Sequence, residues 1–149
     1  MIVRPSTPQI LTDVAEELRR EILPELTTTT LQIRLQMIMS VLEQCAARSG
    51  IEIALMRAEI ASYRDYADRV ADATGSEAVR AAADAVVVGD DLRLDAVSAE
   101  YACAGEALAT ALEAALDAGD QQLVAEGEGL LTARIATEQG LTALATAGR

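Results

Sequence analysis

Apolar residues recur three and four positions apart along most of this chain of 149 residues. The pattern is clearest over residues 92–118. One side of a helix there carries Leu94, Val97, Tyr101, Ala104, Leu108, Ala111 and Ala115. This spacing is typical of an amphipathic α-helix, whereas a half-buried strand alternates at every second residue. The sequence therefore predicts an all-α protein.

Turn-forming residues divide the pattern into a bundle of five or six helices. The breaks fall at Pro24, Gly50, Gly75, Gly89 and Gly119. We expect helices over about 7–23, 31–48, 51–73, 76–88, 92–118 and 121–145. The last two are rich in alanine and are joined by a tight turn, which favours a long antiparallel hairpin with close axes in the C-terminal half.

The length of the chain predicts a single helical domain over residues 1–149. Within it, a first part over residues 1–73 holds three helices, and an acidic, alanine-rich part covers residues 76–149. The composition is 51% apolar but only 2% aromatic, so we expect a core of small aliphatic side chains. The expected core positions of the second helix are Leu31, Leu35, Ile38, Leu42 and Cys45.

The chain contains no histidine and no lysine. It therefore lacks an imidazole base, a histidine metal ligand and a lysine for Schiff-base chemistry. Asp90, Asp91 and Asp95 cluster at the start of a helix, where oxygen ligands for a divalent cation and ordinary helix capping are the two interpretations. Capping is favoured, because the spacing matches no calcium loop. We expect no catalytic residue, metal site or cofactor in this chain.

The whole chain has a net charge of −12, and the negative charge is concentrated after residue 50. Residues 1–50 hold five arginines and six acidic residues, whereas residues 51–149 hold seven arginines and eighteen acidic residues. A field of this sign repels nucleic-acid phosphates and anionic lipids. We therefore expect neither nucleic acid nor a membrane as a partner.

The two cysteines, Cys45 and Cys103, fit no zinc-binding or redox spacing. Each lies in a helical apolar pattern, which predicts a free thiol in the core. The opening residues do not resemble a signal peptide, and no stretch has the length of a membrane span. We therefore expect the cytoplasm, where thiols stay reduced.

The second helix carries more apolar surface than one core face requires. Ile33, Met37 and Val41 lie beside its main apolar side. A helix that is apolar around most of its circumference is either central in a bundle or covered by another chain. The near-neutral charge of residues 1–50 makes a surface for another chain credible here.

Arg34 lies at the edge of the same apolar surface. One interpretation is that its guanidinium binds a carboxylate or phosphate of a ligand or partner. The other is a structural ion pair with an internal acid such as Glu16 or Glu59. The sequence alone leaves both open.

The opening stretch carries a pattern of helix-boundary residues. It consists of Arg4-Pro5, Thr7, Leu11, Val14, Leu18, Glu21, Ile22-Leu23-Pro24 and Leu26. With these residues, the first 66 or so positions resemble a family of small bacterial proteins of uncharacterised domain type. Its members often open on Arg-Pro-Thr, end a first helix in Leu-Pro, and carry an arginine near the start of the second helix, where Arg34 stands here.

That family is encoded beside aminoglycoside-phosphotransferase-like kinases and acyl-CoA dehydrogenases, and one branch is the accessory subunit of the kinase that phosphorylates 4-hydroxyacyl-CoA in levulinate breakdown. The resemblance implies a non-catalytic subunit of a phosphotransferase-type kinase acting on hydroxyacyl-CoA or a related small molecule. We expect Ile33, Arg34, Met37 and Val41 to bind the partner. The alternatives are a self-associating structural or scaffolding bundle and a small-molecule-binding helical domain.

Overall fold

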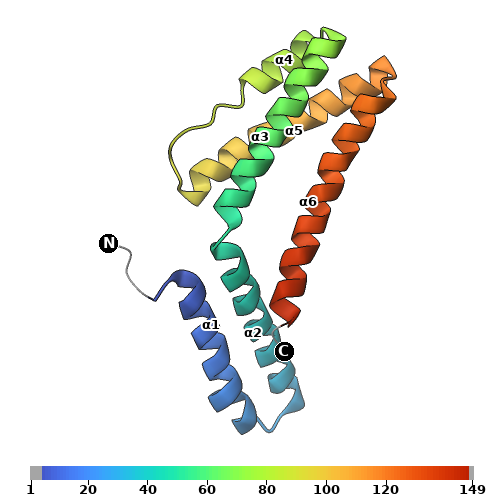
Figure 1. Ribbon diagram of the computed structural model, residues 1–149. Coiled ribbons are helices and arrows are strands. Elements are labelled where there is room, and N and C mark those ends of the chain that lie inside the picture. Colours follow the sequence, from blue (N-terminus) through green and yellow to red (C-terminus); the bar gives the residue numbers. More distant parts are fainter. Residues whose placement is uncertain (1–4, 148–149) are drawn as a thin grey trace. The chain divides into compact units, whose positions relative to one another are not determined.

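The computed structural model describes residues 5–147, and its side chains through Leu141. Over this range the chain forms six α-helices and no strand, which confirms the all-α class (Figure 1). In chain order they are α1 (Thr7–Glu17), α2 (Thr29–Ser49), α3 (Glu52–Thr74), α4 (Glu77–Asp84), α5 (Leu94–Ala118) and α6 (Gln121–Ala147). A π-helical turn, η1 (Leu18–Ile22), and a 3-10 turn, η2 (Leu23–Glu25), follow α1 directly.

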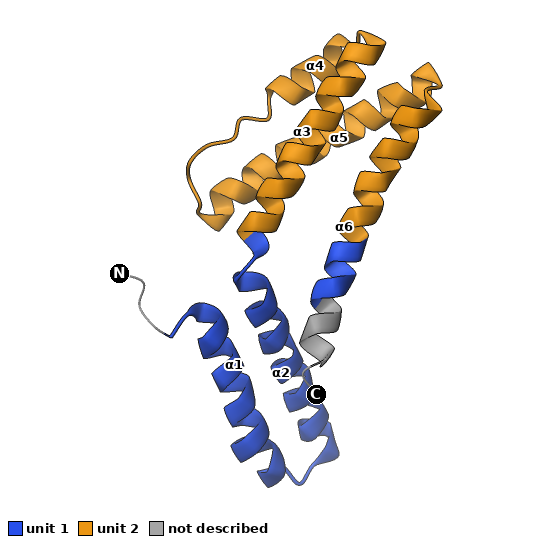
Figure 2. Cartoon of the chain, viewed as in Figure 1, with its two compact units in different colours: residues 1–52, 136–149 blue, residues 53–135 orange. Residues whose placement is uncertain are grey.

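The chain is organised as two compact units (Figure 2). Unit 1 consists of residues 1–52 and 136–149, and unit 2 consists of residues 53–135. This grouping differs from the sequence-based division into residues 1–73 and 76–149. The reason is that the buried side of α3 belongs to the same core as α4, α5 and the first part of α6.

In unit 1, α1 packs beside α2. The buried positions of this pair are Ala15 on α1 and Leu35, Met39 and Ala46 on α2. The expected core positions of α2 are wrong in part: Leu35 is buried and Leu42 half-buried, but Leu31, Ile38 and Cys45 are exposed. Because α2 is apolar around most of its circumference, its sequence does not distinguish the side that faces α1.

The helical path that begins with α1 does not stop at Leu23 but continues to Glu25. The Leu23 amide donates to the Leu18 carbonyl, five residues earlier, which defines the π turn. Pro24, which has no amide hydrogen, is accommodated in the 3-10 turn that follows. From α1 to Leu26, the less exposed leucine and alanine side chains are Leu11, Ala15, Leu18, Leu23 and Leu26. Their spacing thus widens from three or four to five at the π turn.

Unit 2 has the larger core. Its most deeply buried large side chains include Tyr63 and Tyr66 of α3, and α5 contributes mainly alanines. The side chain of Asp120 caps α6, because its Oδ1 accepts from the amides of Gln122 (3.0 Å) and Leu123 (3.1 Å). Gly119, with φ of +68°, forms the tight turn between α5 and α6.

At Gly127, α6 lies very close to both α3 and α5. A Cβ atom at this position would lie 2.7 Å from the Tyr66 hydroxyl oxygen and 2.9 Å from Cδ1 of Leu112. The Tyr66 hydroxyl also donates to the carbonyl of Leu123 at 2.9 Å. The absence of a side chain at Gly127 therefore lets α3, α5 and α6 meet.

Both cysteines are free, as expected, but neither is in the core. Cys45 and Cys103 are exposed, so the predicted burial of their thiols is wrong. Cys103 immediately precedes Ala104, which is fully buried, and adjacent helical residues point to different sides. Cys45 lies on the flank of α2, outside the line of Leu35, Met39 and Ala46.

This exposure predicts rapid modification of both thiols in the folded protein. A water-soluble thiol reagent added to reduced native protein should titrate two thiols without denaturant, since exposure rather than unfolding governs access. The same count should be found after denaturation. Thiols that react only in denaturant would contradict the exposed positions of Cys45 and Cys103.

Candidate functional site

The residues expected to bind a partner all lie on the surface of unit 1. Met37 is 65% exposed, Val41 56% and Ile33 52%, and Arg34 is also exposed. Of the two interpretations of this apolar surface, a central position in a bundle does not hold for these four residues. Their role in binding a partner stays a prediction.

Arg34 forms no hydrogen bond or ion pair within the part of the chain that the structure describes. The two acids considered for it are placed otherwise. Glu16 is exposed on α1, and Glu59 accepts hydrogen bonds from tyrosines of unit 2. The internal ion pair is therefore not formed, and the guanidinium remains available to an anionic group from outside.

Unit 1 exposes further apolar side chains beyond the four predicted residues. They are Ile10, Val14, Ile22, Leu31, Ile38 and Ile51. The sequence does not identify them as exposed, because it does not say which part of a wide apolar arc faces a neighbouring helix. Unit 1 thus exposes apolar side chains on both α1 and α2.

A small cavity in unit 1 is lined by Gln44, Arg48, Glu138 and Leu141. Its volume of about 20 Å³ is close to what one water molecule requires. Arg48 spans one side of it through ion pairs with Glu52 (3.5 Å) and Glu138 (3.4 Å). A metabolite does not fit this cavity, so it gives no support to small-molecule binding.

In unit 2, a carboxylate and two tyrosines connect α3 with α5. Glu59 Oε2 accepts hydrogen bonds from the hydroxyls of Tyr63 (3.4 Å) and Tyr101. The two rings lie 6.1 Å apart, and the guanidinium of Arg134 on α6 lies 5.3 Å from the centroid of the Tyr101 ring. Burial raises the pKa of both tyrosines, and the Glu59 hydrogen bond raises that of Tyr101 further. With its acceptor oxygen engaged by two hydroxyls, Glu59 serves to join helices.

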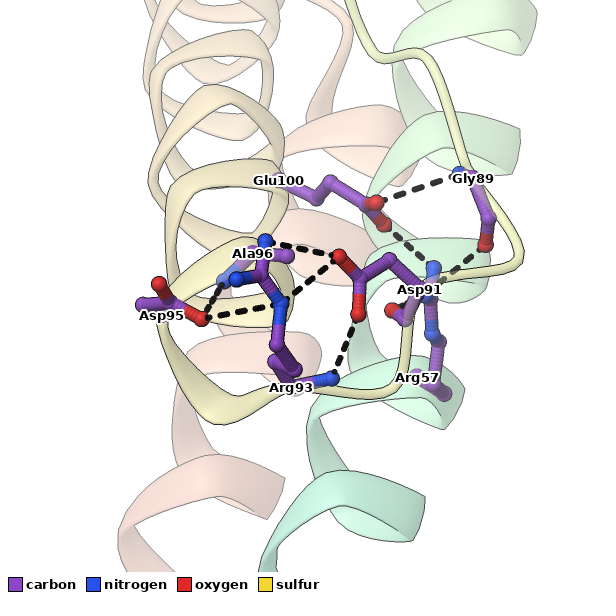
Figure 3. Close-up of polar contacts among 7 residues, drawn as sticks. All are labelled: Arg57, Gly89, Asp91, Arg93, Asp95, Ala96 and Glu100. Atoms are coloured by element: carbon purple, nitrogen blue, oxygen red, sulfur yellow. Dashed lines mark hydrogen bonds and ion pairs between the residues drawn. The ribbon is translucent and has the colours of Figure 1, made fainter.

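A second polar group of unit 2 fixes the segment between α4 and α5 (Figure 3). Arg57 forms an ion pair with Glu100 and donates to the carbonyls of Gly89 (2.9 Å) and Asp91 (3.0 Å). Glu100 in turn accepts from the amide of Gly89 at 3.1 Å. Arg57 and Glu100 are both less than one-fifth exposed. They therefore hold the loop backbone at Gly89 and at Asp91.

Two of the three aspartates at the start of α5, Asp91 and Asp95, form local hydrogen bonds. Asp91 Oδ1 accepts from the amide of Arg93 (2.9 Å), and Asp91 Oδ2 accepts from its guanidinium (2.9 Å). Asp95 accepts from the amide of Ala96. The N-cap residue of α5 is Arg93 rather than an aspartate. Over the described residues, no three potential ligand side chains gather in a way that suits a metal ion.

Comparisons of the chain with protein-family models, with curated proteins and with solved structures gave no match. Among the helices within residues 5–147, none is both long and apolar enough to cross a lipid bilayer.

Proposed function

We propose that this chain is a non-catalytic accessory subunit of a phosphotransferase-type kinase that acts on hydroxyacyl-CoA or a related small molecule. The observation that carries the proposal is the exposure of Ile33, Met37 and Val41 on one side of α2. Scattered exposed apolar residues are ordinary, but a helix face of them marks a surface for another molecule. The resemblance of residues 2–66 to the accessory family supplies the class of partner.

Helical spacing explains how this face works as one surface. Met37 and Val41 follow Ile33 at intervals of four residues, so the three side chains lie along one side of α2. Burying the exposed half of each would contribute on the order of 1 kcal/mol before association costs. The flexible side chain of Met37 adapts to an irregular opposing surface.

Arg34 supplies a polar contact at the edge of this face. It precedes Met37 by three residues and Val41 by seven, so it borders the same side of the helix. Its free guanidinium suits a bidentate contact with a carboxylate of the partner or a phosphate of its substrate. The chain itself contributes no histidine or lysine. In this proposal, the nucleotide, the metal ion and the catalytic base therefore belong to the kinase.

The test is a charge placed on this face. Met37→Glu or Val41→Asp should leave the melting temperature of the isolated chain nearly unchanged, because both side chains are already more than half exposed. Either change should weaken co-purification with a phosphotransferase-like kinase encoded beside this chain by at least about tenfold, because the new charge must be desolvated in the complex.

Gln36→Glu is the matched control. Gln36 is exposed on the same helix, but it lies away from the line of Ile33, Met37 and Val41. It should leave both stability and co-purification unchanged. Equal loss of binding in all three variants would contradict a specific face. The absence of a kinase of this type among the neighbouring genes would contradict the proposed partner.

Self-association is the second candidate function, and the exposed apolar side chains on both α1 and α2 favour it. A pair of helices that exposes apolar residues can pair with a second copy and form a four-helix arrangement, as in scaffolding bundles. Sedimentation of the isolated chain distinguishes the two candidates. A stable dimer that Met37→Glu dissociates would favour the scaffold over the kinase subunit.

A further inference from the structure

The loop between α4 and α5 exposes several aliphatic side chains although its backbone is fixed. We call residues 85–93 the clamped loop, since Arg57 and Glu100 hold its backbone at Gly89 and Asp91. Within it, Val87 is 72% exposed and Leu92 64%. Val88 and Leu94, the first residue of α5, are about half exposed.

Both ends of this segment are anchored in the core. Val86 at one end and Val97, just beyond the other, are almost completely buried. The clamped loop itself forms neither helix nor strand. The contacts of Arg57 with two of its carbonyls hold its backbone in place. The segment therefore loses little conformational freedom when another molecule covers it, which favours binding.

The charges near the clamped loop restrict what can cover it. Asp84, Asp90 and Asp95 are exposed around it, and Arg93, which pairs with Asp91 and Asp95, is the one cation within it. The charge of Arg57, which contacts the loop from α3, is paired with Glu100. Unit 2 as a whole holds six arginines and sixteen acidic residues, a net charge of −10. This field repels a second copy of unit 2 and attracts a cationic partner.

We propose that the clamped loop is a docking surface for a protein segment that carries apolar side chains flanked by arginine or lysine. Val87 and Leu92 contact the apolar side chains of that segment, and the surrounding aspartates contact its cations. The proposal does not rest on the proposed function, because this loop belongs to unit 2 and the predicted kinase contact to unit 1.

The probe is a fluorescently labelled amphipathic helical peptide with leucines on one side and lysines on the other. We expect saturable binding to the full-length chain, followed by fluorescence anisotropy. The double substitution Val87→Ser, Leu92→Ser should weaken binding about tenfold or more. Both side chains are exposed, so circular dichroism should show an unchanged fold.

Leu116→Ser is the matched control. Leu116 is 56% exposed on α5 in the same acidic unit, with Glu113 and Asp117 nearby in sequence. Its substitution should leave the affinity unchanged, because Leu116 lies outside the clamped loop. Equal loss of affinity in both variants would show that the peptide binds exposed aliphatic side chains of unit 2 in general. A peptide with glutamate in place of lysine should not bind.

A further variant tests the role of the clamp. Arg57→Gln removes the ion pair with Glu100 but retains every exposed aliphatic side chain. It should weaken peptide binding severalfold while the helical content is retained. Equal affinity of the wild-type chain and the Val87→Ser, Leu92→Ser variant would overturn the proposal, as would failure of the wild-type chain to bind. A wild-type dimer that the same double substitution dissociates would identify a second copy as the occupant and would also overturn it.

Discussion

Replacing Gly127 by alanine is expected to lower the free energy of unfolding of unit 2 by about 2 kcal/mol. The added methyl group would lie within 3 Å of both the Tyr66 hydroxyl and Leu112 Cδ1. Tyr66 has little room to move, because its ring is fully buried and its hydroxyl is bonded to the Leu123 carbonyl. The resulting strain outweighs the gain of about 1 kcal/mol that alanine brings to a helix interior.

Gly129→Ala, in the same helix, is expected to have the opposite effect on the free energy of unfolding. No atom lies within 4 Å of the position where its Cβ would be built. Only the higher helix propensity of alanine then acts, so the free energy of unfolding of this variant should rise by up to about 1 kcal/mol. Urea denaturation of the two variants and the wild type measures the difference. Equal effects of the two substitutions would show that close packing at Gly127 does not contribute to stability.

Raising the pH above 10 is expected to unfold unit 2. Burial raises the pKa of Tyr63, Tyr66 and Tyr101, and these are the only tyrosines of the chain. The folded state therefore keeps phenolic protons that the unfolded chain releases near its ordinary tyrosine pKa of about 10. The stability that these three tyrosines contribute is fully present below about pH 10. It is lost as the pH rises toward the higher tyrosine pKa values of the folded state. The slope reaches at most about 4 kcal/mol per pH unit for three tyrosines.

The titration of the tyrosines can be followed without overlap from lysine, because the chain contains no lysine. Tyrosinate absorbance and far-ultraviolet circular dichroism should be followed together as the pH is raised. Tyrosinate should appear only as helix content falls. In a Tyr101→Phe variant, the total absorbance change should fall by about one third. Ordinary titration of all three tyrosines near pH 10 with an intact helix signal would contradict their burial.

The sequence predicts unit 2 better than unit 1, and the width of the apolar arc explains the difference. On α3 most charged residues gather on one side of the helix, and Ile60, Tyr63 and Val70 on the opposite side are buried. On α5, five of the seven positions predicted from the helical spacing are buried, namely Val97, Ala104, Leu108, Ala111 and Ala115. On α2 the apolar residues surround most of the helix. The predicted core there includes Ile38 and Cys45, which the structure exposes.

Sequence patterns do not predict the polar contacts of unit 2. Arg57 and Glu100 are 43 residues apart, and their contacts with the loop depend on how α3 and α5 pack. Helical spacing gives the side of a helix on which each residue lies, but not which side of the neighbouring helix it meets. The exposed apolar face of α2, in contrast, was recognisable because all its members lie within nine residues of one helix, from Ile33 to Val41.

The π turn at Leu18–Ile22 holds one residue more than an α-helical turn requires. If one residue were deleted there, Leu18 and the residue now at Leu23 would stand four apart, the normal interval for one side of an α-helix. A related sequence can therefore lack this residue and still form the same pair of helices. An alignment of α1 and α2 with any other sequence should permit a one-residue gap between positions 18 and 23, since an ungapped alignment would shift Pro24 and every position of α2.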